Sequence, residues 1–171
     1  MVKLETFLFS QQADILDRWF NLVLADYPSE TANFFGSEKD PFANPVGFEL
    51  RKGLRGLLEE LLQPKASEKT TNILEQILKI RAVQDFSPSR AAGFPLYLKQ
   101  VIREMLAEKT QGELPWQELT VFESKIDALT LLAFDVYTSK REQLYLIRIK
   151  ELKESIPRVY RDAAVRHCSR I

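Results

Sequence analysis

Apolar residues recur every three or four positions through most of the chain, and this spacing places them on one face of an α-helix. The pattern predicts a first helix over 4–24, a second from 45 to about 63, and a third from 67 to about 84. A fourth helical stretch follows Ser87 and carries apolar residues as far as Leu106. Pro95 interrupts it, so this helix either restarts at Phe94 or kinks over 91–93.

Local signals mark where some of these helices begin and how they pack. Asn44 followed by Pro45 is typical of a helix start, and the same pair of signals recurs at Ser87. Gly53 and Gly56 lie on adjacent turns of the second helix, where each costs up to about 1 kcal/mol relative to alanine. We expect the close approach of another helix to offset this cost.

The stretch over 26–44 is rich in Pro, Gly, Ser and Asn, which predicts a loop. Its three phenylalanines, Phe34, Phe35 and Phe42, either pin this loop to the core or let it close over something. Trp19 falls within the apolar stripe of the first helix, so we expect it to anchor the core rather than lie exposed.

A longer helix is predicted near the C-terminal end. Between Pro115 and Ile156 the chain has no glycine and no further proline, so one helix of about 40 residues fits. Its middle, 129–137, is apolar on nearly every side, and we expect the other helices to sheathe it. The predicted core-facing stripe comprises Leu119, Phe122, Ile126, Leu129, Ala133 and Val136.

Beyond Lys140 this helix carries two apolar faces. One, called the Leu144 face below, contains Leu144 and Ile147. The other, called the Tyr145 face, is the predicted interface and contains Tyr145, Ile149, Leu152 and Ile156. Two such faces indicate packing against a second chain or packing back on the same chain. The predicted organisation is a helical domain over 1–156 with the long helix 115–156, followed by a basic C-terminal tail over 157–171.

Composition narrows the class of protein. The 171 residues carry 24 Lys and Arg against 24 Asp and Glu, which argues against a dedicated nucleic-acid binder. The basic excess after residue 139 fits a solvated helix better than a contact with RNA or anionic membrane. No apolar run is long enough to span a membrane and no signal peptide is recognisable. With Cys168 as the single cysteine, we expect a cytoplasmic protein.

Candidate chemistry is sparse. Arg81 and Asp85 flank the turn after the third helix, where they form a surface pair or line a small-ligand pocket with Arg103. Two arginines around Tyr145 could bind a phosphate or carboxylate, or form the solvated rim of an interface. No metal-ligand cluster, phosphate-binding loop or nucleophile motif is present, so we expect a protein that is not an enzyme.

Four segments together resemble a known family: 15–20, 40–47, 80–89 and 133–142. They read ILDRWF, DPFANPVG, IRAVQDFSPS and AFDVYTSKRE. Their order and spacing between residues 8 and 152 are similar to the N-terminal sensing domain of RsbT co-antagonist proteins, the RsbRD N-terminal family. The chain is most similar to the stand-alone copies found in sulfate-reducing bacteria near genes for sulfite reduction.

The resemblance implies an all-α fold, globin-like or a related helical bundle, that binds no haem or other cofactor and commonly dimerises. The single histidine, His167, lies at the tail rather than in a haem-facing helix, which agrees with that expectation. In stressosome proteins the last helix leads into a STAS domain that takes part in a serine-kinase switch. No STAS sequence follows Ile156 here, so we expect a role other than direct stressosome output.

The expected function is a non-catalytic sensory or regulatory domain that signals through helix packing and protein–protein contacts. The alternative is a structural or assembly adaptor for a redox complex linked to sulfite reduction. Expected partners are a second copy of the chain and another protein, with room for a small-molecule ligand. No nucleic acid and no membrane span is expected.

Overall fold

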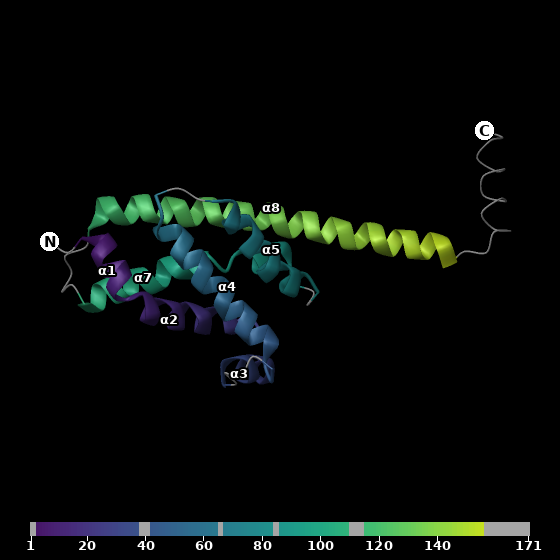
Figure 1. Cartoon of the computed structure of the whole chain (residues 1–171), viewed down its shortest axis with the longest axis horizontal. Helices are drawn as coiled ribbons and strands as arrows, with labels where there is room; N and C mark the ends of the chain where they lie inside the picture. Colours follow the sequence, from purple (N-terminus) through teal and green to yellow (C-terminus); the bar gives the residue numbers. More distant parts are fainter. Residues whose placement is uncertain (1–2, 38–41, 65–66, 84–85, 110–114, 156–171) are drawn as a thin grey trace. The chain divides into compact units, whose positions relative to one another are not determined.

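A computed structural model describes residues 3–37, 42–64, 67–83, 86–109 and 115–155, and every element within these ranges is a helix (Figure 1). The helices are α1 (Leu4–Ser10), α2 (Gln12–Leu24), α3 (Ser29–Ser37), α4 (Pro45–Leu62), α5 (Glu68–Val83), α6 (Pro88–Ala92), α7 (Leu96–Lys109) and α8 (Trp116–Ser155). The predicted all-α class with a long C-terminal helix is confirmed. The globin-like arrangement stays a prediction.

The chain divides into two units, residues 1–138 and 139–171, which are described separately. The hydrophobic core belongs to the first unit. There α2 packs against both α4 and α7, and α5 lies along α4. The boundary predicted between residues 156 and 157 lies outside the described residues.

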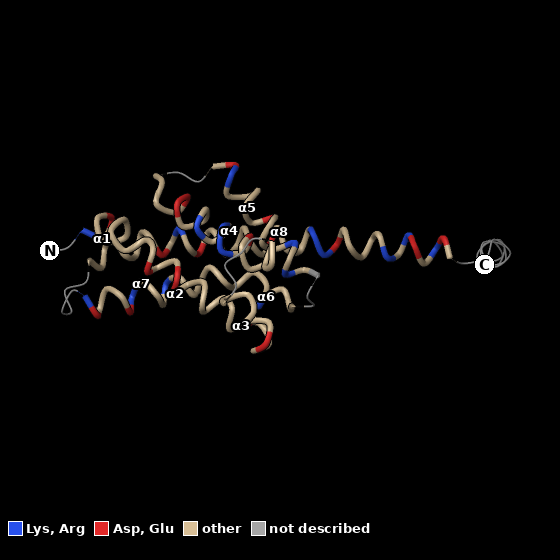
Figure 2. Tube along the Cα trace, turned by 60° about the horizontal axis from the view of Figure 1, so that its bottom comes forward, with Lys and Arg blue, Asp and Glu red and all other residues tan. Residues whose placement is uncertain are grey.

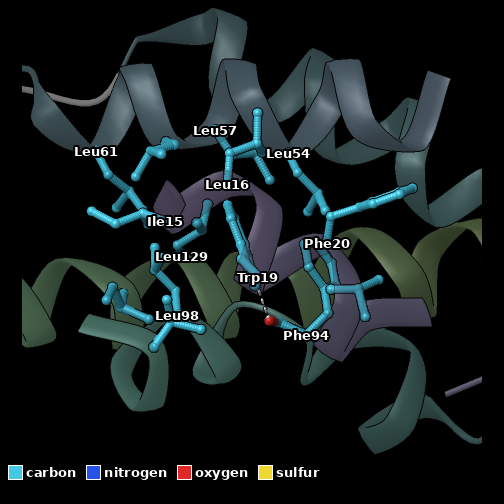
Figure 3. Packing of buried hydrophobic residues seen from close by; sticks show 14 of the residues in the cluster. Ile15, Leu16, Trp19, Phe20, Leu54, Leu57, Leu61, Phe94, Leu98 and Leu129 are labelled. Carbon is cyan, nitrogen blue, oxygen red and sulfur yellow. Dashed lines mark hydrogen bonds between the residues drawn. The ribbon is translucent and has the colours of Figure 1, made fainter. Parts of the chain in front are cut away.

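Trp19 anchors this core, as predicted. Its side chain is fully buried on α2, its indole stacks against Phe94 with ring centroids 6.2 Å apart, and its Nε1 donates a 2.9 Å hydrogen bond to the Phe94 carbonyl. Figure 3 shows the indole between the leucines of α4 and the segment around Phe94. The tryptophan thus joins α2 to the start of α7 through both packing and a hydrogen bond.

The capping prediction is confirmed at the start of α4, whereas Ser87 before α6 makes no side-chain cap hydrogen bond. The buried Asn44 side chain accepts a 2.9 Å hydrogen bond from the Gly47 N–H, and Pro45 takes the first helical position. The Asn44 amide also donates a 3.0 Å hydrogen bond to the Phe35 carbonyl, near the end of α3. One side chain therefore begins α4 and holds α3 against it.

The two glycines of α4 face α5, as their spacing predicted. A Cβ atom on Gly53 would lie 2.7 Å from Cγ1 of Ile77, whereas one on Gly56 would meet only the terminal methyl of Ile73, at 2.9 Å. Ile77 is buried and cannot move aside, but Ile73 is only partly buried. The absence of side chains at these positions is what lets the two helices approach.

We expect Gly53→Ala to lower the free energy of unfolding by about 1 kcal/mol, because overpacking outweighs the gain in helix propensity. Gly56→Ala is the matched control, and we expect its effect to stay within about 0.5 kcal/mol. Urea denaturation followed by circular dichroism measures both values. Equal effects for the two variants would contradict the packing argument.

Two helix boundaries differ from the predictions. The first predicted helix is divided at Gln11 into α1 and α2. Ser10 Oγ donates a 2.9 Å hydrogen bond to the Phe7 carbonyl, and such bonding competes with the regular helix pattern. The fourth predicted helix is interrupted: α6 ends at Ala92, and α7 begins at Leu96, two residues after the predicted restart at Phe94. The helix therefore restarts and does not kink.

The expected loop over 26–44 is wrong in part, because it contains α3. Pro28 directly precedes this helix and Gly36 lies in its last turn, so residues that are common in loops here mark the ends of a helix. Phe35 packs edge-on against Tyr27 at 5.5 Å and pins α3, whereas Phe34 and Phe42 remain exposed. Phe35 therefore holds α3 against the segment that follows α2.

In the first part of α8 every residue of the predicted core-facing stripe is buried, and so is Tyr137, which the prediction did not include. The buried residues are Leu119, Phe122, Ile126, Leu129, Ala133, Val136 and Tyr137. The expectation that residues 129–137 are sheathed on every side is wrong, since Leu131 is 70% exposed and Phe134 is 45% exposed. The apolar segment 129–137 of α8 therefore has a solvent-exposed face as well as the face that packs on the core.

Candidate functional site

The C-terminal part of α8 carries the predicted interface. Residues 139–155 are helical, and none of them is buried. The described members of the Tyr145 face, Tyr145, Ile149 and Leu152, are exposed, as are both residues of the Leu144 face. Ile156 lies outside the described residues. These side chains form the apolar surface that the prediction requires, and the interface itself stays a prediction.

One arginine beside this interface is engaged within the helix. Arg141 Nε donates a 2.7 Å hydrogen bond to the Tyr145 hydroxyl, and its guanidinium lies 5.5 Å from the centre of the same ring. This contact spans one helical turn. The tyrosine hydroxyl is therefore occupied by Arg141, an arrangement that fits the rim of an interface better than a phosphate site.

Arg81 does not lie on the surface, so that part of the surface-pair expectation is wrong. Its side chain is 0% exposed, and its Nη2 donates to the carboxylate of Asp26 and, at 2.9 Å, to the Arg90 carbonyl. The guanidinium lies 4.7 Å from the ring centre of Phe86 and slightly farther from the rings of Tyr27 and Phe94. A buried ion pair enclosed by aromatic rings replaces the expected surface pair.

Asp26 is the centre of this buried cluster. Besides Arg81, its carboxylate accepts a 2.7 Å hydrogen bond from the Tyr97 hydroxyl, and its backbone carbonyl accepts one of 2.5 Å from Arg90. Burial raises the pKa of the Tyr97 phenol, and the hydrogen bond to Asp26 adds to this effect. Burial also raises the pKa of Tyr27. The cluster joins the end of α2 to α5, α6 and α7.

A hydrogen bond connects the cluster's neighbourhood to α8. The buried Tyr137 hydroxyl donates to the carbonyl of Phe86, whose ring packs on Arg81. Tyr137 lies next to the last residue of the first unit. A rearrangement around Arg81 would therefore reach α8 through two consecutive contacts.

Arg81 and Arg103, two of the three residues of the predicted ligand pocket, have no contact partner in common among the described residues. Arg103 is exposed and forms two hydrogen bonds with Glu123, at 2.6 and 2.8 Å, in surroundings different from those of Arg81. Asp85 lies outside the described residues, so a pocket that includes it stays a prediction. A signal for the burial of Arg81 existed, because it follows Ile77 by four positions on the apolar stripe of α5.

Two adjoining hollows on the first unit could hold a small molecule. The larger, about 480 Å³, lies among α1, the end of α4 and the start of α8, and the smaller, about 210 Å³, lies among α4, α5 and α8. Leu61, Pro64 and Lys125 line both. Lys125 Nζ donates to the carbonyls of Leu61 and Gln63, at 3.2 and 2.8 Å, and so caps the end of α4. The hollows are mainly apolar, which suits a compact apolar ligand.

The larger hollow also contains a long-range cap. The carboxylate of Glu118, on the first turn of α8, accepts a 2.6 Å hydrogen bond from the backbone N–H of Leu4. This N–H is one of the donors that the start of a helix leaves unpaired, and a negative charge there is favourable. Residues separated by most of the chain therefore meet at this wall.

Within the described ranges no group of three or more His, Cys, Asp or Glu side chains is placed to hold a metal ion. No helix among them is both long and apolar enough to cross a membrane. His167 and Cys168 lie outside the described residues.

Comparison with protein families gives a match over most of the chain. The family model described as the RsbT co-antagonist protein rsbRD N-terminal domain matches residues 13–152, which is most of the chain. The match includes α2 to α7 and α8 as far as Leu152, and so covers the described Tyr145 face. No curated protein and no solved structure is significantly similar to the chain.

Proposed function

Because the chain belongs to the family of RsbT co-antagonist protein RsbRD N-terminal domains, a family of sensory and regulatory domains, we propose that it is a non-catalytic regulatory module. Its output is the C-terminal part of α8. A second copy of the chain binds the Tyr145 face, and the resulting homodimer is the form that contacts a protein partner. The observation that carries this proposal is the exposure of large apolar side chains along residues 144–152.

Physical reasoning supports a role in association. Single exposed apolar residues are common on protein surfaces, but a continuous set on one helix leaves a large area unfavourably hydrated. Tyr145, Ile149 and Leu152 are spaced by four and three residues, which is the spacing of the contact positions in a coiled coil. A second copy with the same spacing would cover these side chains.

The route from sensing to output passes through the first unit. The proposed input is a ligand or partner that changes the packing around the hollows at Lys125 or the buried pair of Arg81 and Asp26. Both places contact α8, through Lys125 itself and through the hydrogen bond from Tyr137 to Phe86. A change in either contact would shift the population of α8 between two packing arrangements, and the dimer would present this shift to its protein partner.

The homodimer is tested by placing a charge on the Tyr145 face. We expect Leu152→Glu to weaken self-association by at least about tenfold, because a carboxylate would be buried in an apolar contact. The matched control is Leu146→Glu, since Leu146 is also 66% exposed but lies outside both faces. Sedimentation velocity over a range of concentrations measures both variants. A wild-type chain that remains monomeric at every concentration contradicts the proposal.

The second candidate function is the adaptor. Leu146 and the Leu144 face remain exposed when the Tyr145 face is covered, and this observation favours further contacts. An adaptor should co-purify with a defined protein complex, whereas a sensor should take up a small molecule in the first unit. Mass spectrometry of the purified protein under native conditions separates the two.

A further inference from the structure

The charges that flank the Leu144 face are arranged so that the face complements a second copy of itself running in the opposite direction. Lys140, Leu144, Ile147 and Glu151 are spaced by four, three and four residues, so they lie along one side of α8. In this order the side chains are basic, apolar, apolar and acidic. Read from the other end, they are acidic, apolar, apolar and basic.

This symmetry decides how two copies can pair. In an antiparallel pair centred between residues 145 and 146, Lys140 of each copy faces Glu151 of the other, and Leu144 faces Ile147. In a parallel pair in register, Lys140 faces Lys140 and Glu151 faces Glu151, so like charges meet at both ends. Like charges placed together cost several kcal/mol, and opposite charges fix the register. The antiparallel arrangement is the complementary one.

A dimer through the Tyr145 face alone leaves apolar area exposed. Leu144 and Ile147 are 36% and 55% exposed, and a two-stranded coiled coil covers only one stripe of each helix. A helix that is apolar on more than one side is normally covered on more than one side. The Leu144 face therefore needs an occupant other than the copy on the Tyr145 face.

We propose that the Leu144 face binds a further copy of the same chain in antiparallel orientation, so that two dimers form a tetramer. The inference rests on the proposed function, because the Tyr145 face supplies the dimers. In the proposed tetramer both Leu144 faces of one dimer meet those of the other, so that two weak contacts reinforce each other. In such a closed tetramer each chain has two isologous contacts, which corresponds to dihedral symmetry.

The charges beside this face are compatible with the pairing. Arg148 and Arg141 lie at its edge, where water and salt screen their repulsion, and Arg141 already contacts Tyr145. Lys150 forms a 4.0 Å ion pair with Glu154 on the next turn of the same helix. Figure 2 shows basic and acidic residues alternating along this part of α8.

Charge reversal tests the orientation. We expect the wild-type chain to sediment with the mass of four chains. Lys140→Glu and Glu151→Lys should each weaken the association of dimers by at least about tenfold, because like charges then meet in the antiparallel pair. The double variant carrying both reversals should recover the tetramer, since its pattern is again self-complementary. Circular dichroism checks that each variant keeps its helical content.

The outcomes separate this inference from the proposed function. A wild-type chain that stays a dimer at high concentration overturns the tetramer and leaves the dimer standing. A monomer overturns both. If the single reversals dissociate the tetramer and the double variant does not restore it, the antiparallel pairing is overturned.

Cysteine cross-linking gives an independent readout of orientation. In a chain carrying Cys168→Ser, the variants Leu144→Cys and Ile147→Cys are prepared separately and then mixed. Antiparallel pairing should give disulfides mainly between the two different variants. Disulfides mainly between identical Leu144→Cys chains would show parallel pairing and overturn the proposal.

Discussion

Replacing Asp26 with alanine is expected to lower the free energy of unfolding by about 3–5 kcal/mol, because the fully buried guanidinium of Arg81 loses its carboxylate. Two other nitrogen atoms of that guanidinium, Nε and Nη1, have no hydrogen-bond partner in the described part of the chain. The aromatic rings around the arginine attract the charge but cannot neutralise it. The Tyr97 hydroxyl would lose its acceptor as well. Chemical denaturation followed by circular dichroism measures the loss.

The matched control is Asp17→Ala. Asp17 also pairs with an arginine, Arg51, but more than a third of each side chain is exposed to solvent. An exposed pair of this kind contributes about 0–1 kcal/mol, since water already solvates both charges. Similar losses for the two aspartates would mean that the Arg81 pair is not buried in the folded protein.

Trp19→Ala is the other substitution with a large expected effect, a loss of about 3–5 kcal/mol. It removes the largest fully buried side chain and leaves the Phe94 carbonyl without the indole N–H. Surrounding residues on α2, α4 and α7 are held by their own helices, so they can fill the resulting cavity only in part. Thermal and urea unfolding provide the measurement.

Trp116→Ala is the corresponding control, because Trp116 is 62% exposed at the start of α8. We expect its effect to stay within about 0.5 kcal/mol. These are the two tryptophans of the chain, so fluorescence also distinguishes them. In Trp116→Phe the remaining emission should be blue-shifted and should move to the red on unfolding. Emission at long wavelength in the folded state would contradict the burial of Trp19.

Local chemistry made several features predictable from the sequence. The start of α4 depends on Asn44 and its neighbour Pro45, so the residues that determine it are adjacent. The close packing of α4 on α5 was indicated by Gly53 and Gly56, because glycine in a helix needs a compensating contact. The core stripe of α8 followed from helical periodicity alone.

Features that depend on distant partners were not predictable in the same way. Arg81 is buried because Asp26 and three aromatic rings meet it from other helices, and no local pattern identifies these partners. Asp26 itself was assigned to a loop. Tyr137 was read as part of an apolar run, but its hydroxyl forms the contact between α8 and Phe86. Periodicity identifies a buried position and does not identify the atoms that will surround it.

The exposed side of α8 shows a second limit. Leu131 and Phe134 lie in the most apolar part of the helix and are nevertheless exposed in the first unit. Hydrophobicity averaged around a helix therefore predicts that an apolar surface exists, but the number of neighbouring helices decides how much of it is covered. The described residues of the candidate interface are apolar and exposed, whereas the interface and its occupant stay proposals.

The hydrogen bond from Leu4 to Glu118 sets the order in which the protein can be completed during synthesis. The two residues are separated by 114 positions, so the cap on α1 cannot form until the beginning of α8 has left the ribosome. Contacts of such long range close late, because the intervening chain must first be ordered. The contact of α1 with α8 is therefore expected among the last native contacts to form, after α1 has packed on its neighbour α2.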